Sequence, residues 1–157
     1  QCRNRNIGTD LIVHASASAG AQAGLVFGKS LLGMPGQILG INVFHPDPKT
    51  LKDRILTLAQ TMSERWPDAA VGKTFQVDVN HAYFGDGYGL PTPACINAIR
   101  MAAQLEGLLF DPVYSGKALA ALIDQINLGN FNHLTDVILV HTGGSASLGA
   151  YIDAFDE

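Results

Sequence analysis

Two kinds of segment in this sequence combine residue types and spacing that could do chemistry: a loop of small residues, and loops that carry a tyrosine. The first is residues 15–21 (ASASAGA), which follow an apolar run and lead into a helix-forming stretch. Backbone N–H groups at a helix N-terminus, with no bulky side chain in the way, form an anion site, typically for phosphate. The same residues also suit a tight strand-to-helix turn that serves packing alone, so both interpretations stay open. The GxGxxG fingerprint of dinucleotide-binding loops is absent.

The second kind is a pair of tyrosines in loops, where a phenol could donate or accept a proton. Tyr88 lies between two glycines, and Tyr114 follows the Asp-Pro turn of residues 111–117 (DPVYSGK). Each phenol could instead anchor its loop by a hydrogen bond, the usual role of a half-buried tyrosine. A third motif, residues 141–144 (HTGG), follows the last apolar run. The five histidines show no HxxH or HxxxH spacing, so no metal site is expected.

Apolar and amphipathic segments alternate along the chain and predict the elements that position these motifs. Short apolar runs predict strands at residues 11–15, 38–44 and 137–140, and an alternating run predicts a partly exposed strand at 74–79. Helices are predicted at residues 22–32, after Asp47, from the N-cap Thr92 to Gly107, over the stretch from Leu119 to Ile126, and at 147–155. Strands that alternate with helices predict an α/β fold, an open and mostly parallel sheet with helices on both faces.

The predicted fold also indicates where a ligand would bind. In open α/β sheets, ligands bind at the carboxyl ends of the strands. Three loops of small residues fall at such ends, at residues 16–21, 86–92 and 142–145, so the active surface is expected there. Residues 1–9 are predicted to be a polar loop that leads into the first strand, and residues 10–157 to be the α/β domain.

Composition narrows the class of protein. The 157 residues are 47% hydrophobic and 15% charged, which excludes a disordered tail. A formal charge of −4 and a pI near 5.6 argue against a nucleic-acid partner. No apolar run approaches the roughly 18 residues of a spanning helix, so no membrane partner is expected and a cytoplasmic protein is predicted. The two cysteines form no CxxC pair.

The tyrosine motifs and the HTGG motif, in this order and spacing, resemble the pyridoxal-phosphate enzymes of the D-cysteine desulfhydrase and aminocyclopropane-carboxylate deaminase group, which have fold type II. The resemblance extends from about Asp10 to Tyr151. Among the members, the L-cysteate sulfo-lyases look most similar, through residues 14–16 (HAS), 22–25 (QAGL), 85–92 (GDGYGLPT) and 114–117 (YSGK). The resemblance implies the large-domain portion of a tryptophan-synthase-β-like fold, pyridoxal 5'-phosphate as cofactor, a small amino-acid substrate and a homodimer.

Roles for individual residues follow from the same resemblance. The cofactor phosphate would be held mainly by the N–H groups of Ser18, Ala19, Gly20 and Ala21. Tyr88 and Tyr114 match the two active-site tyrosines, which shape the substrate pocket and can take part in proton transfer. Thr142 matches the residue that hydrogen-bonds the pyridine nitrogen of the cofactor. A neutral hydroxyl there leaves that nitrogen largely unprotonated, which suits elimination of a good β-leaving group.

Three departures from the family pattern qualify this reading. The deaminase branch has Glu after its second tyrosine, whereas this chain has Ser115, which favours β-elimination of sulfite or sulfide over ring-opening deamination. The phosphate loop of the group usually has Thr where this chain has Ala21, and losing that hydroxyl removes a bond worth roughly 1.5–3 kcal/mol. The Schiff-base lysine of the family lies in its N-terminal half, before the phosphate loop, and nothing in this chain matches that half.

The predicted function is therefore that of the C-terminal half of a carbon–sulfur lyase, which acts on L-cysteate or D-cysteine together with the N-terminal half of the same enzyme. The alternative is a catalytically incompetent fragment or pseudoenzyme that lacks the lysine. A third interpretation is a phosphate-ligand binding domain unrelated to pyridoxal chemistry. Turnover after removal of the two tyrosine hydroxyls would separate this last interpretation from the first.

Overall fold

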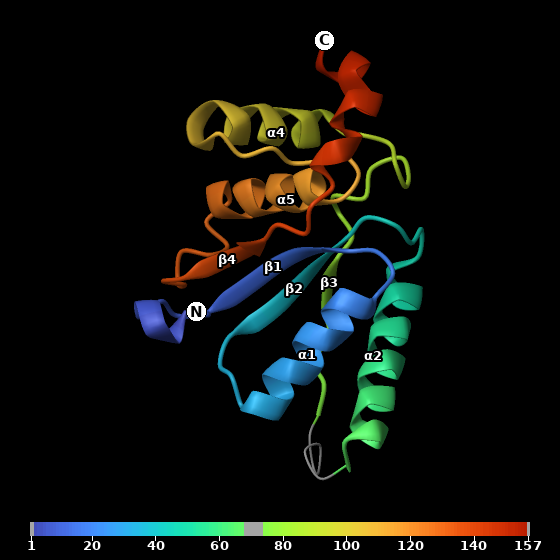
Figure 1. Cartoon of the computed structure of the whole chain (residues 1–157), viewed down its shortest axis with the longest axis vertical. Coiled ribbons are helices and arrows are strands. Elements are labelled where there is room, and N and C mark those ends of the chain that lie inside the picture. Colours follow the sequence, from blue (N-terminus) through green and yellow to red (C-terminus); the bar gives the residue numbers. More distant parts are fainter. Residues whose placement is uncertain (1, 68–73, 157) are drawn as a thin grey trace.

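The core of the structure is a parallel four-stranded sheet in the order β3-β2-β1-β4 (Figure 1). The computed structural model describes residues 2–67 and 74–156, and Gln1 and Lys73 lie outside the described residues. The strands are β1 (Leu11–Ser16), β2 (Gln37–Asn42), β3 (Asp78–Asn80) and β4 (Val137–Val140). In register, Val13 of β1 lies opposite Leu39 of β2 and Leu139 of β4. The predicted parallel α/β sheet is confirmed.

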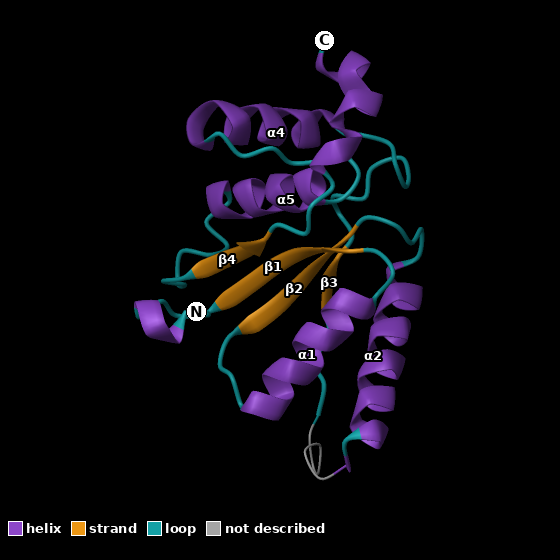
Figure 2. Cartoon of the chain, in the orientation of Figure 1, coloured by secondary structure: helices purple, strands orange, loops and turns teal. Residues whose placement is uncertain are grey.

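Helices cover both faces of this sheet, as predicted, but they form an additional layer on one side (Figures 1 and 2). On one face lie α1 (Gly20–Leu32) and α2 (Pro48–Arg65), and on the other lies α5 (Ser115–Asn127). The helix α4 (Pro93–Glu106) packs on the side of α5 that faces away from the sheet. The chain ends in a 3₁₀ segment, η2 (Ser145–Phe155), beside α4.

Three buried apolar clusters hold these layers together. The first lies between the sheet and α5, the second joins α1 and α2, and the third joins α4 and α5. In the first, Leu11 and Val13 of β1 and Ile41 of β2 pack against Ala118 and Ala121 of α5. The small alanines let the helix approach the strands closely, which keeps the N-terminus of α5 next to the carboxyl end of the sheet.

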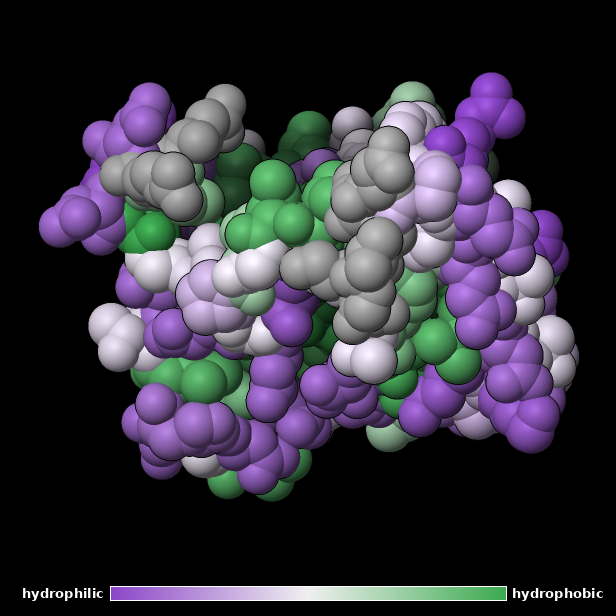
Figure 3. Space-filling model, turned by 90° about the horizontal axis from the view of Figure 1, so that it is seen from below, coloured by the Kyte–Doolittle hydropathy of each residue, from purple (hydrophilic) through white to green (hydrophobic). Residues whose placement is uncertain are grey.

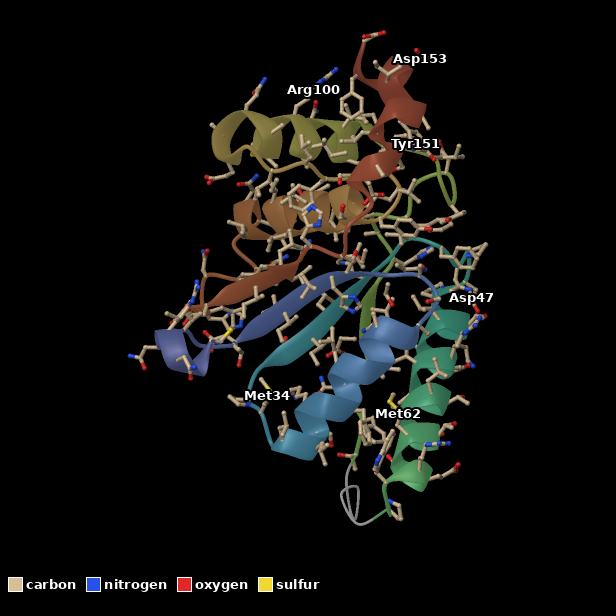
Figure 4. The ribbon with its side chains drawn as sticks, viewed as in Figure 1. Met34, Asp47, Met62, Arg100, Tyr151 and Asp153 are labelled. Atoms are coloured by element: carbon tan, nitrogen blue, oxygen red, sulfur yellow. The ribbon has the colours of Figure 1, made fainter. Side chains whose placement is uncertain are left out.

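Two helices begin at the caps that the sequence predicts. Asp47 accepts hydrogen bonds from the backbone N–H groups of Lys49 and Thr50 at the start of α2 (Figure 4). Thr92 accepts one from the N–H of Cys95 at the start of α4. In both helices proline is the first residue, where no N–H donor is needed. These caps fix where the loops before α2 and α4 end.

Two strand predictions were longer than the observed strands. The run predicted at 38–44 leaves the sheet after Asn42, because its side-chain oxygen accepts the N–H groups of Phe44 and His45 and turns the chain. The strand predicted at 74–79 is wrong in extent: β3 covers only Asp78–Asn80 and pairs with residues 39–41 of β2. Residues 74–77 therefore have no strand partner in the described sheet.

The chain ends also differ from the prediction. The C-terminal helix predicted at 147–155 is the 3₁₀ segment η2, interrupted at Tyr151 with φ −124° and ψ 22°. Its Leu148 and Phe155 pack against the cluster between α4 and α5, and Arg100 of α4 donates a hydrogen bond to the Phe155 carbonyl (Figure 4). These tertiary contacts, rather than a continuous helical ladder, hold η2. The loop predicted at 1–9 contains a 3₁₀ turn, η1 (Arg3–Arg5).

The surface seen from below carries apolar patches between hydrophilic side chains (Figure 3). At the C-terminal end of α1, Leu31 and Leu32 are exposed. Within the described residues, no helix combines the length and the apolar character needed to cross a membrane.

Candidate active site

The loop between β1 and α1 presents backbone N–H groups at the carboxyl end of the sheet. Ala19, the residue before the helix, has a φ of 75°, and no side chain caps the first turn of α1. Ser18, Gly20 and Ala21 are exposed, and a Cβ placed on Gly20 would meet nothing within 4 Å. An uncapped helix N-terminus with open space in front of it can bind an anion through its N–H groups and its dipole.

A small pocket of about 120 Å³ opens on this loop. Residues from three separate parts of the chain line it: the β1–α1 loop, Tyr114 before α5, and Thr142 after β4. The structure therefore brings together most of the predicted cofactor-binding residues and one of the two predicted catalytic tyrosines. They line the pocket as Ser18, Ala19, Ala21, Thr142 and Tyr114, and Gly20 lies between two of them in the chain.

Two buried side chains at the pocket have polar atoms that no described residue satisfies. Ser16, at the end of β1, is 2% exposed and its hydroxyl oxygen has no hydrogen-bond partner. Gln22 in the first turn of α1 is fully buried; its amide nitrogen donates to the Asp78 carbonyl at 2.8 Å, while its amide oxygen has no partner. Buried polar groups normally have a partner, so the free Ser16 hydroxyl fits a polar ligand at this pocket, whereas the Gln22 amide oxygen lies against Gly40. The hydroxyl and the N–H groups are donors suited to a phosphate.

Tyr88, the other predicted tyrosine, is linked to the pocket through Tyr114. The hydroxyl groups of Tyr88 and Tyr114 are hydrogen-bonded to each other, and the ring centroids lie 5.8 Å apart. The Tyr88 ring also makes an edge contact with Phe44, at 4.8 Å between centroids. The hydrogen bond with Tyr88, together with burial, raises the pKa of Tyr114 to about 12. The Tyr114 phenol therefore keeps its proton at neutral pH.

The buried carboxylate of Asp111 fixes the position of Tyr114. One of its oxygens accepts the N–H groups of Val113 and Tyr114, at 2.8 and 2.7 Å. The other accepts the N–H and the hydroxyl of Ser115, at 2.8 and 2.5 Å. Asp111 thus satisfies the N–H of Ser115, the first residue of α5, and the two N–H groups that precede it. This role of Asp111 was not predicted, although an Asp-Pro pair three to four residues before a helix was a signal for it.

The loop that carries Thr142 is held against the same cluster. His141 bonds the Leu109 carbonyl through Nε2 at 2.9 Å and accepts the N–H of Gly143 at Nδ1, at 3.0 Å. A Cβ on Gly144 would come within 2.6 Å of the Asp111 carboxyl carbon, so this position has room only for glycine. Thr142 itself is exposed and faces the pocket that the β1–α1 loop lines.

Lys117 of α5 also lies near the site, and no role was predicted for it from the motif that contains it. Its side chain is fully buried, and its ammonium group donates hydrogen bonds to the carbonyls of Phe84 and Gly87. A lysine in a helix normally indicates a solvated side chain, and only its place in the DPVYSGK motif distinguished it. Within residues 2–67 and 74–156, no group of three or more His, Cys, Asp or Glu side chains is placed to hold a metal ion.

The chain belongs to the family of pyridoxal-phosphate dependent enzymes, whose family model matches residues 5–143. The predicted cofactor is thereby confirmed as that of the family. The chain is 37% identical over 145 residues to the D-cysteine desulfhydrases of Salmonella paratyphi C (strain RKS4594) and Salmonella choleraesuis (strain SC-B67). The match covers 92% of this chain and 43% of each relative, so the chain spans less than half the length of these relatives.

A solved structure confirms the fold assignment. The crystal structure of an ACC deaminase homologue superposes with a TM-score of 0.81 at 29% identity. The superposition covers 93% of this chain and 43% of that one. The resemblance to the D-cysteine desulfhydrase and aminocyclopropane-carboxylate deaminase group is therefore confirmed, and with it the fold type II architecture.

Proposed function

We propose that this chain forms the C-terminal half of a pyridoxal-phosphate dependent lyase that eliminates the β-substituent of a small sulfur-containing amino acid. The observation that carries the proposal is the pocket shared by the uncapped N-terminus of α1, Thr142 and Tyr114, with Tyr88 bonded to Tyr114. Below, the complete enzyme means this chain together with the N-terminal portion that its longer relatives contain. The homodimer and the cytoplasmic location stay predictions.

Different residues of the pocket would bind different parts of the cofactor. The N–H groups of Ser18, Ala19, Gly20 and Ala21 would hold its phosphate, and the Ser16 hydroxyl, buried without a partner, is a further donor. The Thr142 hydroxyl would bond the pyridine nitrogen without protonating it. When bound, pyridoxal phosphate supplies an electron sink for the carbon next to the substrate amino group.

The two phenols are suited to holding and moving a proton beside the reacting substrate. Tyr114 has a raised pKa and so holds its proton firmly, which suits its hydroxyl to donating a hydrogen bond. Tyr88 shares that hydrogen bond, and its ring contacts Phe44. A proton can pass between the two oxygens without leaving the site.

The choice of reaction rests on the residue that follows the second tyrosine. Ser115 is buried and its hydroxyl is bonded to Asp111, so this position offers no carboxylate to the substrate. A site without that carboxylate suits β-elimination rather than ring opening. With D-cysteine, the complete enzyme would consume one water and release pyruvate, sulfide and ammonia, and with L-cysteate it would release sulfite in place of sulfide. The name of the Salmonella relatives favours D-cysteine, while the sequence motifs favour L-cysteate.

The lysine that binds the cofactor covalently would come from the N-terminal portion. None of the described lysines lines the pocket: Lys117 is engaged with two backbone carbonyls, and Lys49 forms an ion pair with Asp53. The same observation supports the alternative of a catalytically incompetent fragment or pseudoenzyme. Mass spectrometry of the purified protein separates the two, because a chain or a co-purifying partner with the additional lysine supports the lyase.

The test of the proposal is turnover of D-cysteine and L-cysteate by the complete enzyme, followed by pyruvate together with sulfide or sulfite. Tyr88→Phe and Tyr114→Phe remove only the two paired hydroxyls, and at least one of them should lower kcat by about 100-fold or more. Tyr83→Phe is the matched control, since its hydroxyl bonds Asp124 and Gln125 instead of the pocket. Full turnover in both variants, or no visible cofactor absorbance after pyridoxal phosphate is added, would contradict the proposal.

A further inference from the structure

Lys117 is the only lysine in the described part of the chain that is fully buried, and its charge is satisfied by backbone carbonyls. Its Nζ donates to the carbonyl oxygens of Phe84 at 2.6 Å and Gly87 at 3.1 Å. The ammonium also lies 5.7 Å from the centroid of the Phe84 ring, within the range of a cation–π contact. Burial of an ammonium is costly unless it is well hydrogen-bonded, so a lysine at this position implies a specific task.

No charged or titratable group near Lys117, among the described residues, is a partner that would explain the buried ammonium. No described carboxylate lies within ion-pair distance of its Nζ; Asp86 acts on it only at longer range. The neighbouring Cys95 is a thiol whose pKa is raised to about 12 by burial, so it carries no charge at neutral pH. Burial lowers the pKa of Lys117 from its usual value. Its main partners are therefore the two carbonyls of the loop after β3.

That loop carries Tyr88, and its backbone conformation needs to be stabilised by contacts from outside the loop. Gly85 and Gly89 both have a φ of 73°, a left-handed conformation that favours glycine, and Gly87 and Tyr88 lie between them. Tyr88 follows directly after Gly87, whose carbonyl Lys117 binds. Its own side chain is 47% exposed, so packing alone restrains it weakly.

The N-terminus of α5 acts on both tyrosines at once. Tyr114 is the N-cap residue of α5 and is fixed by Asp111, and Lys117 lies three residues further on in the same helix. The helix thus positions Tyr114 directly, and its Lys117 binds the loop that carries Tyr88. The two hydroxyls meet because the positions of both tyrosines depend on the same rigid helix, α5.

We propose that Lys117 is a positioning residue that places the Tyr88 hydroxyl on the Tyr114 hydroxyl by binding the carbonyls of Phe84 and Gly87. This inference rests on the proposed use of the two tyrosines in catalysis. It assigns Lys117 no contact with substrate or cofactor. Its role is to hold the Tyr88 loop in the conformation in which the pair forms.

The first experiment measures the tyrosine pair without any turnover. The complete enzyme is labelled with ¹³C at tyrosine Cζ, the Tyr114 resonance is assigned with Tyr114→Phe, and its pKa is followed in Lys117→Met. Methionine preserves the length and apolar character of the side chain but removes the ammonium. The inference expects the pKa of Tyr114 to fall from about 12 toward 10, because the hydrogen bond with Tyr88 is lost. Lys49→Met, at an exposed ion pair on α2, should leave it unchanged.

The second experiment measures catalysis with the same variants. Lys117→Met should lower kcat by about 100-fold with little change in KM for the substrate, as expected when a proton-transfer group is misplaced. A folded Lys117→Met protein with an unchanged Tyr114 pKa would overturn the inference, even if turnover falls. Because the titration needs neither cofactor nor substrate, its result stands even if the lyase proposal fails.

A further variant keeps the inference testable if Lys117→Met does not fold. Gly85→Ala forces a side chain into a left-handed position, and its Cβ would come within 2.5 Å of the Thr92 methyl group and 3.9 Å of the Lys117 Nζ, while the lysine itself is kept. Displacing the loop that Lys117 holds should again lower the pKa of Tyr114 and kcat together. A Gly85→Ala protein with both values unchanged would show that the pair does not depend on this loop, and the inference would be wrong.

Discussion

Tyr88, in the loop after β3, and Tyr114, before α5, share a hydrogen bond between their hydroxyls although 26 positions separate them in the chain. The pair lies where the carboxyl ends of the strands meet the N-terminus of α5, beside the pocket lined by the phosphate loop. This relationship joins two motifs that the sequence presents separately. It also explains the raised pKa of Tyr114.

The first prediction concerns the proton of Tyr114. In Tyr88→Phe the hydrogen bond that favours the protonated phenol is absent, so the pKa of Tyr114 should fall from about 12 toward 10. The phenolate of Tyr114 should accordingly appear at lower pH in ultraviolet titration, measured as the difference from the Tyr88→Phe/Tyr114→Phe double variant. An unchanged pKa would mean that burial and the nearby Asp111 and Tyr151, rather than the hydrogen bond with Tyr88, raise it.

The second prediction concerns the phosphate loop. Ala21→Thr restores a hydroxyl at the exposed second residue of α1 and should tighten binding of pyridoxal phosphate by roughly 10- to 100-fold, the equivalent of one bond to a charged group. Ala21→Val has the same shape without the hydroxyl and should gain nothing. Affinity is measured by titrating the complete enzyme with cofactor. Equal gains in both variants would assign the effect to shape rather than to the hydroxyl.

The third prediction concerns stability in acid. His14 is fully buried in β1, its Nδ1 lies 2.9 Å from the Ala15 carbonyl, and burial lowers its pKa from 6.5 to about 4. Between these values the unfolded chain binds a proton that the folded chain does not, so this group lowers stability as pH falls from 6.5. The loss should approach about 3 kcal/mol near pH 4 and then level off.

Urea unfolding of the complete enzyme as a function of pH measures this effect. His14→Gln removes the titrating group and should flatten the decline between pH 6.5 and 4, whatever its effect on stability at neutral pH. His133→Gln, at an exposed position, is the control and should keep the decline. If His14→Gln declines as steeply as the parent protein, then another group is responsible.

The fourth prediction concerns the carboxylate under Tyr114. Asp111→Asn replaces one acceptor oxygen by an N–H₂ group that faces N–H donors, so the free energy of unfolding should fall by about 1.5–3 kcal/mol. The change should also lower kcat, because the carboxylate that accepts the Tyr114 N–H and orients Tyr114 is disturbed. Asp53→Asn removes a carboxylate from an exposed ion pair and should cost less than about 1 kcal/mol. Equal losses in the two variants would contradict the role given to Asp111.

Local sequence signals were sufficient for the elements that frame the site. The apolar run of β1, the small residues before α1, and the caps Asp47 and Thr92 each act over a few neighbouring positions, so they could be read in order along the chain. The same holds for the motifs that carry the family resemblance, since their residue types are themselves the signal. The phosphate loop, the two tyrosines and Thr142 were selected in this way.

Tertiary structure decided the contacts that join these elements. The short extent of β3 follows from its pairing with only three residues of β2, and η2 is held by contacts with α4. The Tyr88–Tyr114 bond, the grip of Lys117 on the Phe84 and Gly87 carbonyls, and the shared pocket all link segments 26 or more positions apart. No local pattern predicts such contacts, because they depend on how the packed helices and the sheet bring distant backbone and side-chain atoms together. The residues proposed to carry the chemistry could thus be chosen from the sequence by itself, and the packing of α5 on the sheet decided how they meet.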